Sequence, residues 1–193
     1  MIGARSVPEG PARSVLLLGG LAAAMTVRVA AGLGTTRAGA LFAVLLLATA
    51  AAAGWRPGLP RPGAVAAGVA GAAVLCAAPV LLRLAGRTLV LGPAPIGLLP
   101  TWTAATVLIA VAEEALLRGV LMDAVTSWAG DLAAVAVAAA AFALLHVPLY
   151  GWQAVPLDLA VGVWLGGLRL ATGGIAAPAT AHAVADLVAW WLR

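Results

Sequence analysis

The sequence contains little charge, no lysine and a single cysteine. Its 193 residues include eleven basic side chains, all of them arginine, and seven acidic ones, so charged residues make up 9% of the chain. One cysteine, Cys76, excludes an intramolecular disulfide. The arginines form no cluster that could follow a phosphate backbone, and we expect no nucleic-acid partner. This scarcity of charge and a mean hydropathy of +1.09 exclude an ordinary soluble globular domain.

Hydrophobic residues, 64% of the chain, fall into seven blocks separated by Gly, Pro and Arg. A helix needs about 20 apolar residues to cross the hydrocarbon core of a bilayer. We therefore expect an all-α fold, a polytopic transmembrane helical bundle of about seven spans with an active site inside it. The whole chain, 1–193, would be one integral-membrane domain, with its motif-bearing core at about 96–193. The expected blocks are 14–34, 38–54, 63–84, 96–123, 131–146, 155–171 and 174–192.

Local signals sharpen this division of the chain. Residues 54–62 and 83–95 are expected to be loops, and Pro148 is expected to end the fifth block. Gly162 and Gly166 give the sixth block a face of small residues, which allows close approach of a neighbouring helix. The first block is longer than a typical signal-peptide core, so we expect it to be retained as a span.

The most informative motif is Glu113-Glu114-Ala-Leu-Leu-Arg118, at the end of the fourth block. A charge at the centre of a bilayer costs roughly 2.5–3.5 kcal/mol on insertion scales, so three charges in one span need a use. Glu114 and Arg118 are four residues apart and share a helix face, which favours an ion pair. Glu113 points elsewhere and is available to another partner. Taken alone, the motif is equally consistent with an ion pair that only fixes packing.

The two histidines favour a functional site over an ion pair that only fixes packing. His146 follows Phe142 by four residues, and His182 precedes Asp186 by four, so the Asp186 carboxylate can orient the imidazole of His182. Intramembrane ionisable groups normally face one polar cavity. We therefore expect three apolar helices to contribute to a convergent site. Arg28, by contrast, is expected to extend its charged end to the membrane surface.

In this order and on separate apolar segments, the motifs Glu-Glu-x-x-x-Arg, Phe-x-x-x-His and His-x-x-x-Asp resemble the CPBP family. This family comprises the CAAX proteases and bacteriocin-processing enzymes, also called Abi proteins or intramembrane glutamic endopeptidases. The resemblance covers about 101–193. It implies a multi-pass protein of the cell membrane that hydrolyses a peptide bond of a peptide or membrane-associated protein within the lipid bilayer.

The resemblance also implies roles for individual residues. Glu113 would be the general base and His146 its partner in activating a water molecule, while His182 and Asp186 would act at the tetrahedral oxyanion. Better-studied eukaryotic members carry Asn where this chain has Asp186, and an ionised aspartate cannot donate a hydrogen bond. Asp186 is therefore either protonated or orients His182.

For Glu114, Arg118 and Phe142 the resemblance implies a structural role that supports the catalytic residues. Two kinds of alternative stay open from the sequence. Zinc could be held by Glu113, His146, His182 and Asp186, although no His-Glu-x-x-His pair is present and we expect no cofactor. The same ionisable groups would also serve a proton-coupled transporter, or persist in a non-catalytic membrane adaptor or immunity protein.

Overall fold

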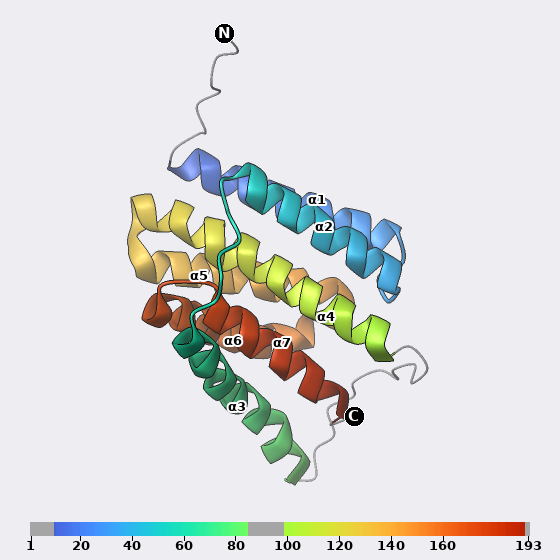
Figure 1. Ribbon diagram of the computed structural model, residues 1–193. Helices are drawn as coiled ribbons and strands as arrows, with labels where there is room; N and C mark the ends of the chain where they lie inside the picture. The colour runs from blue at the N-terminus through green and yellow to red at the C-terminus, as the bar shows by residue number, and fades with distance from the viewer. Residues whose placement is uncertain (1–9, 85–98, 192–193) are drawn as a thin grey trace.

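The computed structural model describes residues 10–84 and 99–191, and these residues form a bundle of helices with no strand (Figure 1). The elements in chain order are α1 (Pro11–Ala30), α2 (Thr36–Ala52), α3 (Pro62–Leu84), α4 (Leu99–Glu114), the π-helix η2 (Ala115–Leu121), α5 (Met122–Tyr150), the 3₁₀ turn η3 (Trp152–Ala154), α6 (Val155–Thr172) and α7 (Ala176–Trp191). The predicted all-α bundle is confirmed. Most of the predicted 83–95 loop lies outside the described residues.

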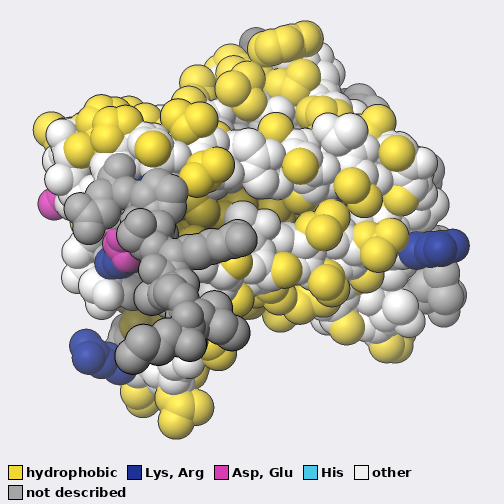
Figure 2. All heavy atoms as spheres, turned by 90° about the horizontal axis from the view of Figure 1, so that it is seen from above, with side chains coloured by type: hydrophobic (Ala, Val, Ile, Leu, Met, Phe, Trp, Pro, Cys, Tyr) yellow, Lys and Arg dark blue, Asp and Glu magenta, His cyan; other side chains and the backbone are white. Residues whose placement is uncertain are grey.

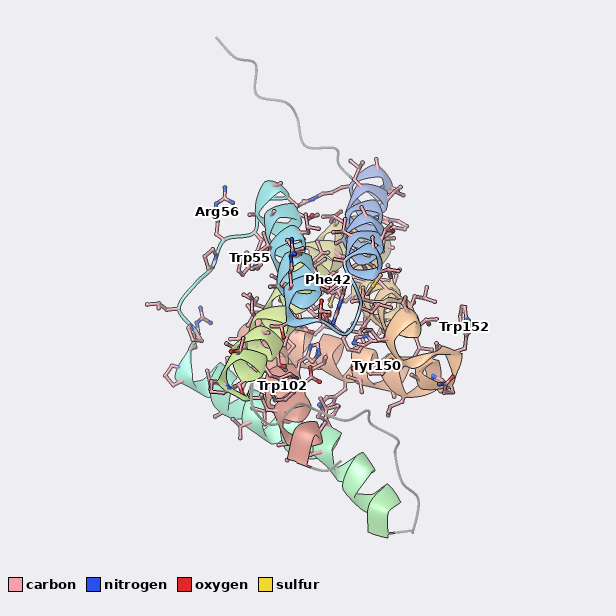
Figure 3. The ribbon with its side chains drawn as sticks, turned by 90° about the vertical axis from the view of Figure 1, so that its right-hand side faces the viewer. Phe42, Trp55, Arg56, Trp102, Tyr150 and Trp152 are labelled. Atoms are coloured by element: carbon pink, nitrogen blue, oxygen red, sulfur yellow. The ribbon has the colours of Figure 1, made fainter. Side chains whose placement is uncertain are left out.

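Helix boundaries follow the Pro, Gly and Thr residues of the sequence. Pro11 opens α1, where its missing N–H costs nothing. The Thr35 hydroxyl accepts a hydrogen bond from the Ala38 amide at 3.1 Å and so caps α2. Residues 55–61 carry no regular structure, which confirms the predicted loop between α2 and α3. Within it, Trp55 turns toward the bundle and Arg56 away from it (Figure 3).

The fourth and fifth blocks differ from the prediction at their boundaries. The fourth was expected to end near Asp123, but the helix continues through η2 into the first part of α5 and breaks at Gly130. Gly130 has φ +82°, which only glycine adopts readily, and the chain reverses there. The fifth was expected to stop before Pro148, but α5 runs through it to Tyr150. Pro148 cannot donate to the Leu144 carbonyl, but the helix continues past it, and the Gly151 amide closes the last turn on the Val147 carbonyl at 2.8 Å.

The helices pack in layers. In Figure 1, the pair α1 and α2 covers α4 and α5, α7 and α6 lie below these, and α3 packs on the far side of α7. The buried core joins apolar side chains of α1, α2, η2 and both parts of α5. This arrangement places the end of α4 in the middle of the bundle, where α7 and α2 both contact it.

Small residues set the close contacts between helices. A Cβ atom at Gly162 of α6 would lie 2.7 Å from the Cα atom of Ala139 in α5, and one at Gly166 would lie 3.0 Å from Val135. A Cβ atom at Gly68 of α3 would lie 2.6 Å from the carbonyl oxygen of Ala177 in α7. The predicted small-residue face of α6 is thus confirmed, and α3 likewise packs closely on α7 through a glycine.

The described residues include three helical stretches that are long and apolar enough to cross a membrane, Pro11–Ala30, Pro100–Tyr150 and Trp152–Thr172. The second includes the break at Gly130. Large apolar side chains are exposed on several helices, among them Leu16, Val44 and Leu132. Figure 2 shows hydrophobic side chains spread across the visible face, with the visible charged ones toward its left and right ends. Such a surface suits lipid contact.

Substituting Gly162 with alanine should destabilise the bundle, because the added methyl group would overlap the α5 backbone at Ala139. Overpacking of this kind typically costs about 1–3 kcal/mol. Gly167 lies on the same helix with nothing within 4 Å of its Cβ position, so Gly167→Ala is the matched control. Thermal unfolding in detergent should show a lower Tm for Gly162→Ala and an unchanged or higher Tm for Gly167→Ala. Equal melting of the two variants would contradict this packing.

Candidate active site

The site begins at the junction of α4 and η2, where three charged side chains are withdrawn from solvent. Glu113 is 2% exposed, and Glu114 and Arg118 are fully buried. The Arg118 guanidinium donates to a Glu114 carboxylate oxygen at 2.6 Å and to the Gly162 carbonyl oxygen at 3.1 Å. This contact confirms the ion pair expected from the i, i+4 spacing. It also ties α4 to α6 at the glycine that approaches α5 most closely.

A π-helical segment, Ala115–Leu121, carries Arg118. Here the Met122 amide donates to the carbonyl oxygen of Leu117, five residues back, instead of that of Arg118, four residues back. The Arg118 carbonyl oxygen accepts a hydrogen bond from Nε of Arg169 in α6 at 2.9 Å. Single π turns occur often at functional sites because they reorient side chains within a helix. This wider turn was not predicted, since no sequence pattern distinguishes it from the surrounding helix.

His182 enters the site from α7 and meets three carboxylates. Its Nδ1 lies 3.0 Å from Oε1 of Glu114, and its Nε2 lies 3.8 Å from Oε2 of Glu113 and 3.5 Å from Oδ2 of Asp186. A carboxylate only accepts, so Nδ1 of His182 carries the proton toward ionised Glu114. The expected pairing of His182 with Asp186 is present. Glu114 also bridges Arg118 to His182, a contact that spacing along one helix cannot reveal.

Glu113 has one carboxylate oxygen, Oε2, that is buried without a hydrogen bond. The structure pairs this oxygen with Nε2 of His182 at 3.8 Å, whereas the resemblance implied His146 as the partner of Glu113. No hydrogen bond or ion pair joins Glu113 to His146, both of which the structure describes. The Glu113 carboxylate therefore has one oxygen that is buried and accepts no hydrogen bond from another side chain.

His146 is held by its own helix. Its Nδ1 lies 2.8 Å from the Phe142 carbonyl oxygen, and because a carbonyl only accepts, Nδ1 carries the proton and Nε2 of the neutral ring is an acceptor. The Phe142 ring packs against the rings of His146 and His182, with centroids 4.5 and 5.3 Å away. The Arg118 guanidinium lies 5.0 Å from the same ring centroid. Phe142 thus separates and positions the ionisable groups around it.

The sequence reading missed Asp158, in the first turn of α6. Its Oδ2 atom is buried without a hydrogen bond. Asp158 could have been found from the sequence, because it is an acidic residue inside an apolar block. Glu113 was selected for the same reason.

The described residues contain no group of three His, Cys, Asp or Glu side chains placed to hold a metal ion. The four residues considered for zinc do not share one centre in this arrangement. Nδ1 of His182 faces Glu114, and its Nε2 faces Glu113 and Asp186. Nδ1 of His146 is hydrogen-bonded to a backbone carbonyl oxygen.

A helical bundle with apolar outer faces and a buried cluster of carboxylates, imidazoles and arginine indicates a membrane protein with a buried polar site. Residues 95–188 match the protein family described as type II CAAX prenyl endopeptidase Rce1-like. Over these residues, just under half of the chain, the protein is therefore similar to the CAAX-protease (CPBP) family, a family of proteases, as the three motifs indicated. No curated protein matches the chain. No solved structure matches it either.

Replacing Glu114 with glutamine should strongly destabilise the protein, because it leaves the buried Arg118 charge without its counter-ion and weakens the contact with His182. Breaking a buried ion pair from one side costs roughly 3–5 kcal/mol. Asp123→Asn is the control, since Asp123 is 58% exposed and pairs with Arg169 near the surface. That change should cost about 0–1 kcal/mol.

Unfolding in a graded mixture of mild detergent and SDS, followed by tryptophan fluorescence, compares the two variants. A Glu114→Gln protein as stable as Asp123→Asn would show that the buried pair does not hold the bundle together.

Proposed function

We propose that this protein is an intramembrane endopeptidase that hydrolyses a peptide bond of a peptide or membrane-associated protein, with Glu113 as the general base. The observation that carries the proposal is the Glu113 carboxylate. It is buried, it has an oxygen without a hydrogen bond, and it lies at the convergence of α4 and α7 beside the imidazole of His182. The match of residues 95–188 to a protease family supports the reaction class.

In the proposed reaction, Glu113 takes a proton from a water molecule as the water oxygen attacks the carbonyl carbon of the substrate. The π electrons of the carbonyl move to its oxygen and form a tetrahedral oxyanion. When this intermediate collapses, the C–N bond breaks, and the departing amine receives the proton from Glu113. A positioned acid–base group of this kind contributes roughly 10²–10⁴-fold to rate.

The other site residues have supporting roles in this proposal. His182, hydrogen-bonded to Glu114 through Nδ1, directs its Nε2 toward the Glu113 carboxylate and so fixes the side of the site that faces it. His146, with its Nδ1 proton on the Phe142 carbonyl, directs Nε2 as an acceptor for the second hydrogen of the water. Asp186, which is 48% exposed, orients His182 from the rim of the site.

The substrate is proposed to reach this site within the bilayer, and the protein to cross the cell membrane several times. The apolar outer faces of the helices support this placement. We propose no cofactor and no nucleic-acid partner. The matching family is described as a CAAX prenyl endopeptidase, so a prenyl group belongs among the substrate features to test.

The proposal predicts loss of cleavage in two site variants of the purified protein reconstituted into liposomes. Quenched-fluorescence peptides, prenylated and unmodified, are incubated with wild type, Glu113→Gln, His146→Ala and the surface control Asp123→Asn. Glu113→Gln should lower kcat by about 10²–10⁴-fold and His146→Ala by about 10²-fold. Asp123→Asn should cleave like wild type, because its side chain lies outside the site.

The same assay separates the alternatives. Cleavage unaffected by Glu113→Gln would refute the glutamate mechanism, and loss of activity on adding a chelator, restored by zinc, would establish a metal mechanism in its place. Proton flux into the liposomes without cleavage of any peptide would identify a transporter.

A further inference from the structure

Arg169 lies in the last turn of α6 and takes no part in the reaction steps proposed above. Its side chain is 19% exposed, and its guanidinium makes two contacts at the junction of η2 and α5. Nε donates to the Arg118 carbonyl oxygen at 2.9 Å, and Nη2 lies 3.0 Å from Oδ1 of Asp123. The second contact is a surface ion pair, because Asp123 is 58% exposed. The first contact is with the main chain of the π turn.

The π turn explains why the Arg118 carbonyl accepts from a side chain. In an α-helix the Met122 amide would donate to this oxygen, but here that amide donates to the Leu117 carbonyl instead. Nε of Arg169 supplies a hydrogen in its place. Arg118 is fully buried, and buried carbonyl oxygens are rarely left without a partner. The side chain of Arg169 therefore satisfies an acceptor that the amide four residues on does not reach.

Helix α6 contacts Arg118 at two points. The Arg118 guanidinium donates to the Gly162 carbonyl at 3.1 Å, and the Arg118 carbonyl accepts from Arg169. Gly162 and Arg169 are seven residues apart, or about two helical turns, so both lie on one face of α6. This face binds the side chain and the main chain of the same residue. The two hydrogen bonds together fix the π turn relative to α6.

The π turn sets the direction in which the proposed base points. It begins at Ala115, directly after Glu113 and Glu114. A π turn accommodates an extra residue in a helix, and each residue of an α-helix is rotated by about 100° from the last. Converting this turn to α-helix would therefore rotate α4 by about 100° relative to the buried side chains of η2. Both glutamates now face His182, at 3.8 and 3.0 Å, and such a rotation would turn them away.

We propose that Arg169 is a positioning residue for the reaction. By donating its Nε hydrogen to the Arg118 carbonyl, it holds the π turn in place, and the π turn directs Glu113 toward the water molecule that it activates. Arg169 touches neither the substrate nor the reacting atoms and acts through the helix that carries the base. The inference rests on the proposed function, because it takes Glu113 as that base. It gives a role to a charged side chain that none of the three motifs includes.

Two substitutions of equal length separate the Nε donor from the rest of the side chain. Arg169→Gln places an amide nitrogen at the position of Nε and keeps a donor there, whereas Arg169→Met places a methyl group there. Neither carries the charge that pairs with Asp123, so the two differ in the donor. Arg37→Met, at an exposed position in α2, is the matched control for loss of an arginine. Kinetics use the full-length protein in liposomes and the best-cleaved peptide of the assay above.

Arg169→Met should lower kcat by about 10²-fold with KM nearly unchanged, because a displaced base slows the chemical step while contacts with the substrate remain. Arg169→Gln should recover most of this loss, and Arg37→Met should match wild type. Each kcat is divided by the folded fraction, which thermal unfolding measures. A purely structural role would lower the Tm and leave the kcat of the folded protein unchanged. Wild-type kcat in Arg169→Met, or an equal loss in Arg169→Gln, would overturn the inference.

A second readout does not depend on cleavage. The chain has two histidines, so the imidazole ¹⁵N NMR spectrum of the protein contains the signals of two rings, and His146→Ala assigns them. In Arg169→Met the two glutamates would leave His182, and the signals of this ring should shift. Arg169→Gln should keep the wild-type signals. His146, whose Nδ1 is bonded within its own helix, is the internal reference. Unchanged His182 signals in Arg169→Met would contradict the proposed role.

Should Arg169→Met fail to fold, Arg169→Lys takes its place. It keeps the charge that pairs with Asp123 but has a methylene group at the position of Nε. Arg169→Lys should be less active than Arg169→Gln, and equal or greater activity would overturn the inference. Glu113→Gln with intact Arg169 is measured alongside. Its retained cleavage would refute the proposed function itself, whereas an inactive Glu113→Gln with a fully active Arg169→Met would refute only the role of Arg169.

Discussion

The Glu114 carboxylate is the interaction on which the rest of the site depends. It accepts from Arg118 at 2.6 Å within its own helix and contacts Nδ1 of His182 at 3.0 Å across to α7. A single buried carboxylate thereby neutralises the buried arginine and fixes which nitrogen of His182 carries a proton. With Nδ1 directed at Glu114, the other nitrogen, Nε2, must face Glu113 and Asp186. The environment of the proposed base is thus set by its sequence neighbour.

Close packing of small residues makes this network possible. Gly162 allows α6 to approach Ala139 of α5, and the carbonyl oxygen of the same glycine accepts from Arg118. Lipid provides no hydrophobic drive for helices to associate, so van der Waals contact and polar interactions between helices hold such a bundle together. The buried charges and the glycine faces therefore support each other. The charges link α4, α6 and α7, and the glycines bring the backbones near enough for those links to form.

Much of the fold was predictable because its signals are local. Gly and Pro mark the ends of apolar blocks, and the expected segments agree with the observed helices except near Gly130 and Pro148. The pair Glu114 and Arg118 follows from helical periodicity, as does the contact between His182 and Asp186. The π turn at Ala115–Leu121 did not follow, because no sequence pattern marks it, and the contact of its Arg118 carbonyl with Arg169 of α6 joins residues far apart in the sequence.

The sequence by itself determined the class of protein, the helical segments and the set of ionisable residues from which a site could be built. Scarce charge and abundant apolar residues leave few positions for chemistry, and motif order then selects among them. Only the tertiary structure decided the pairings between helices. It placed Nε2 of His182 3.8 Å from Glu113 and the Arg28 guanidinium against the buried Phe42 ring. The physical reason is that spacing along one helix fixes which residues share a face, whereas the rotation and approach of neighbouring helices depend on packing across the whole bundle.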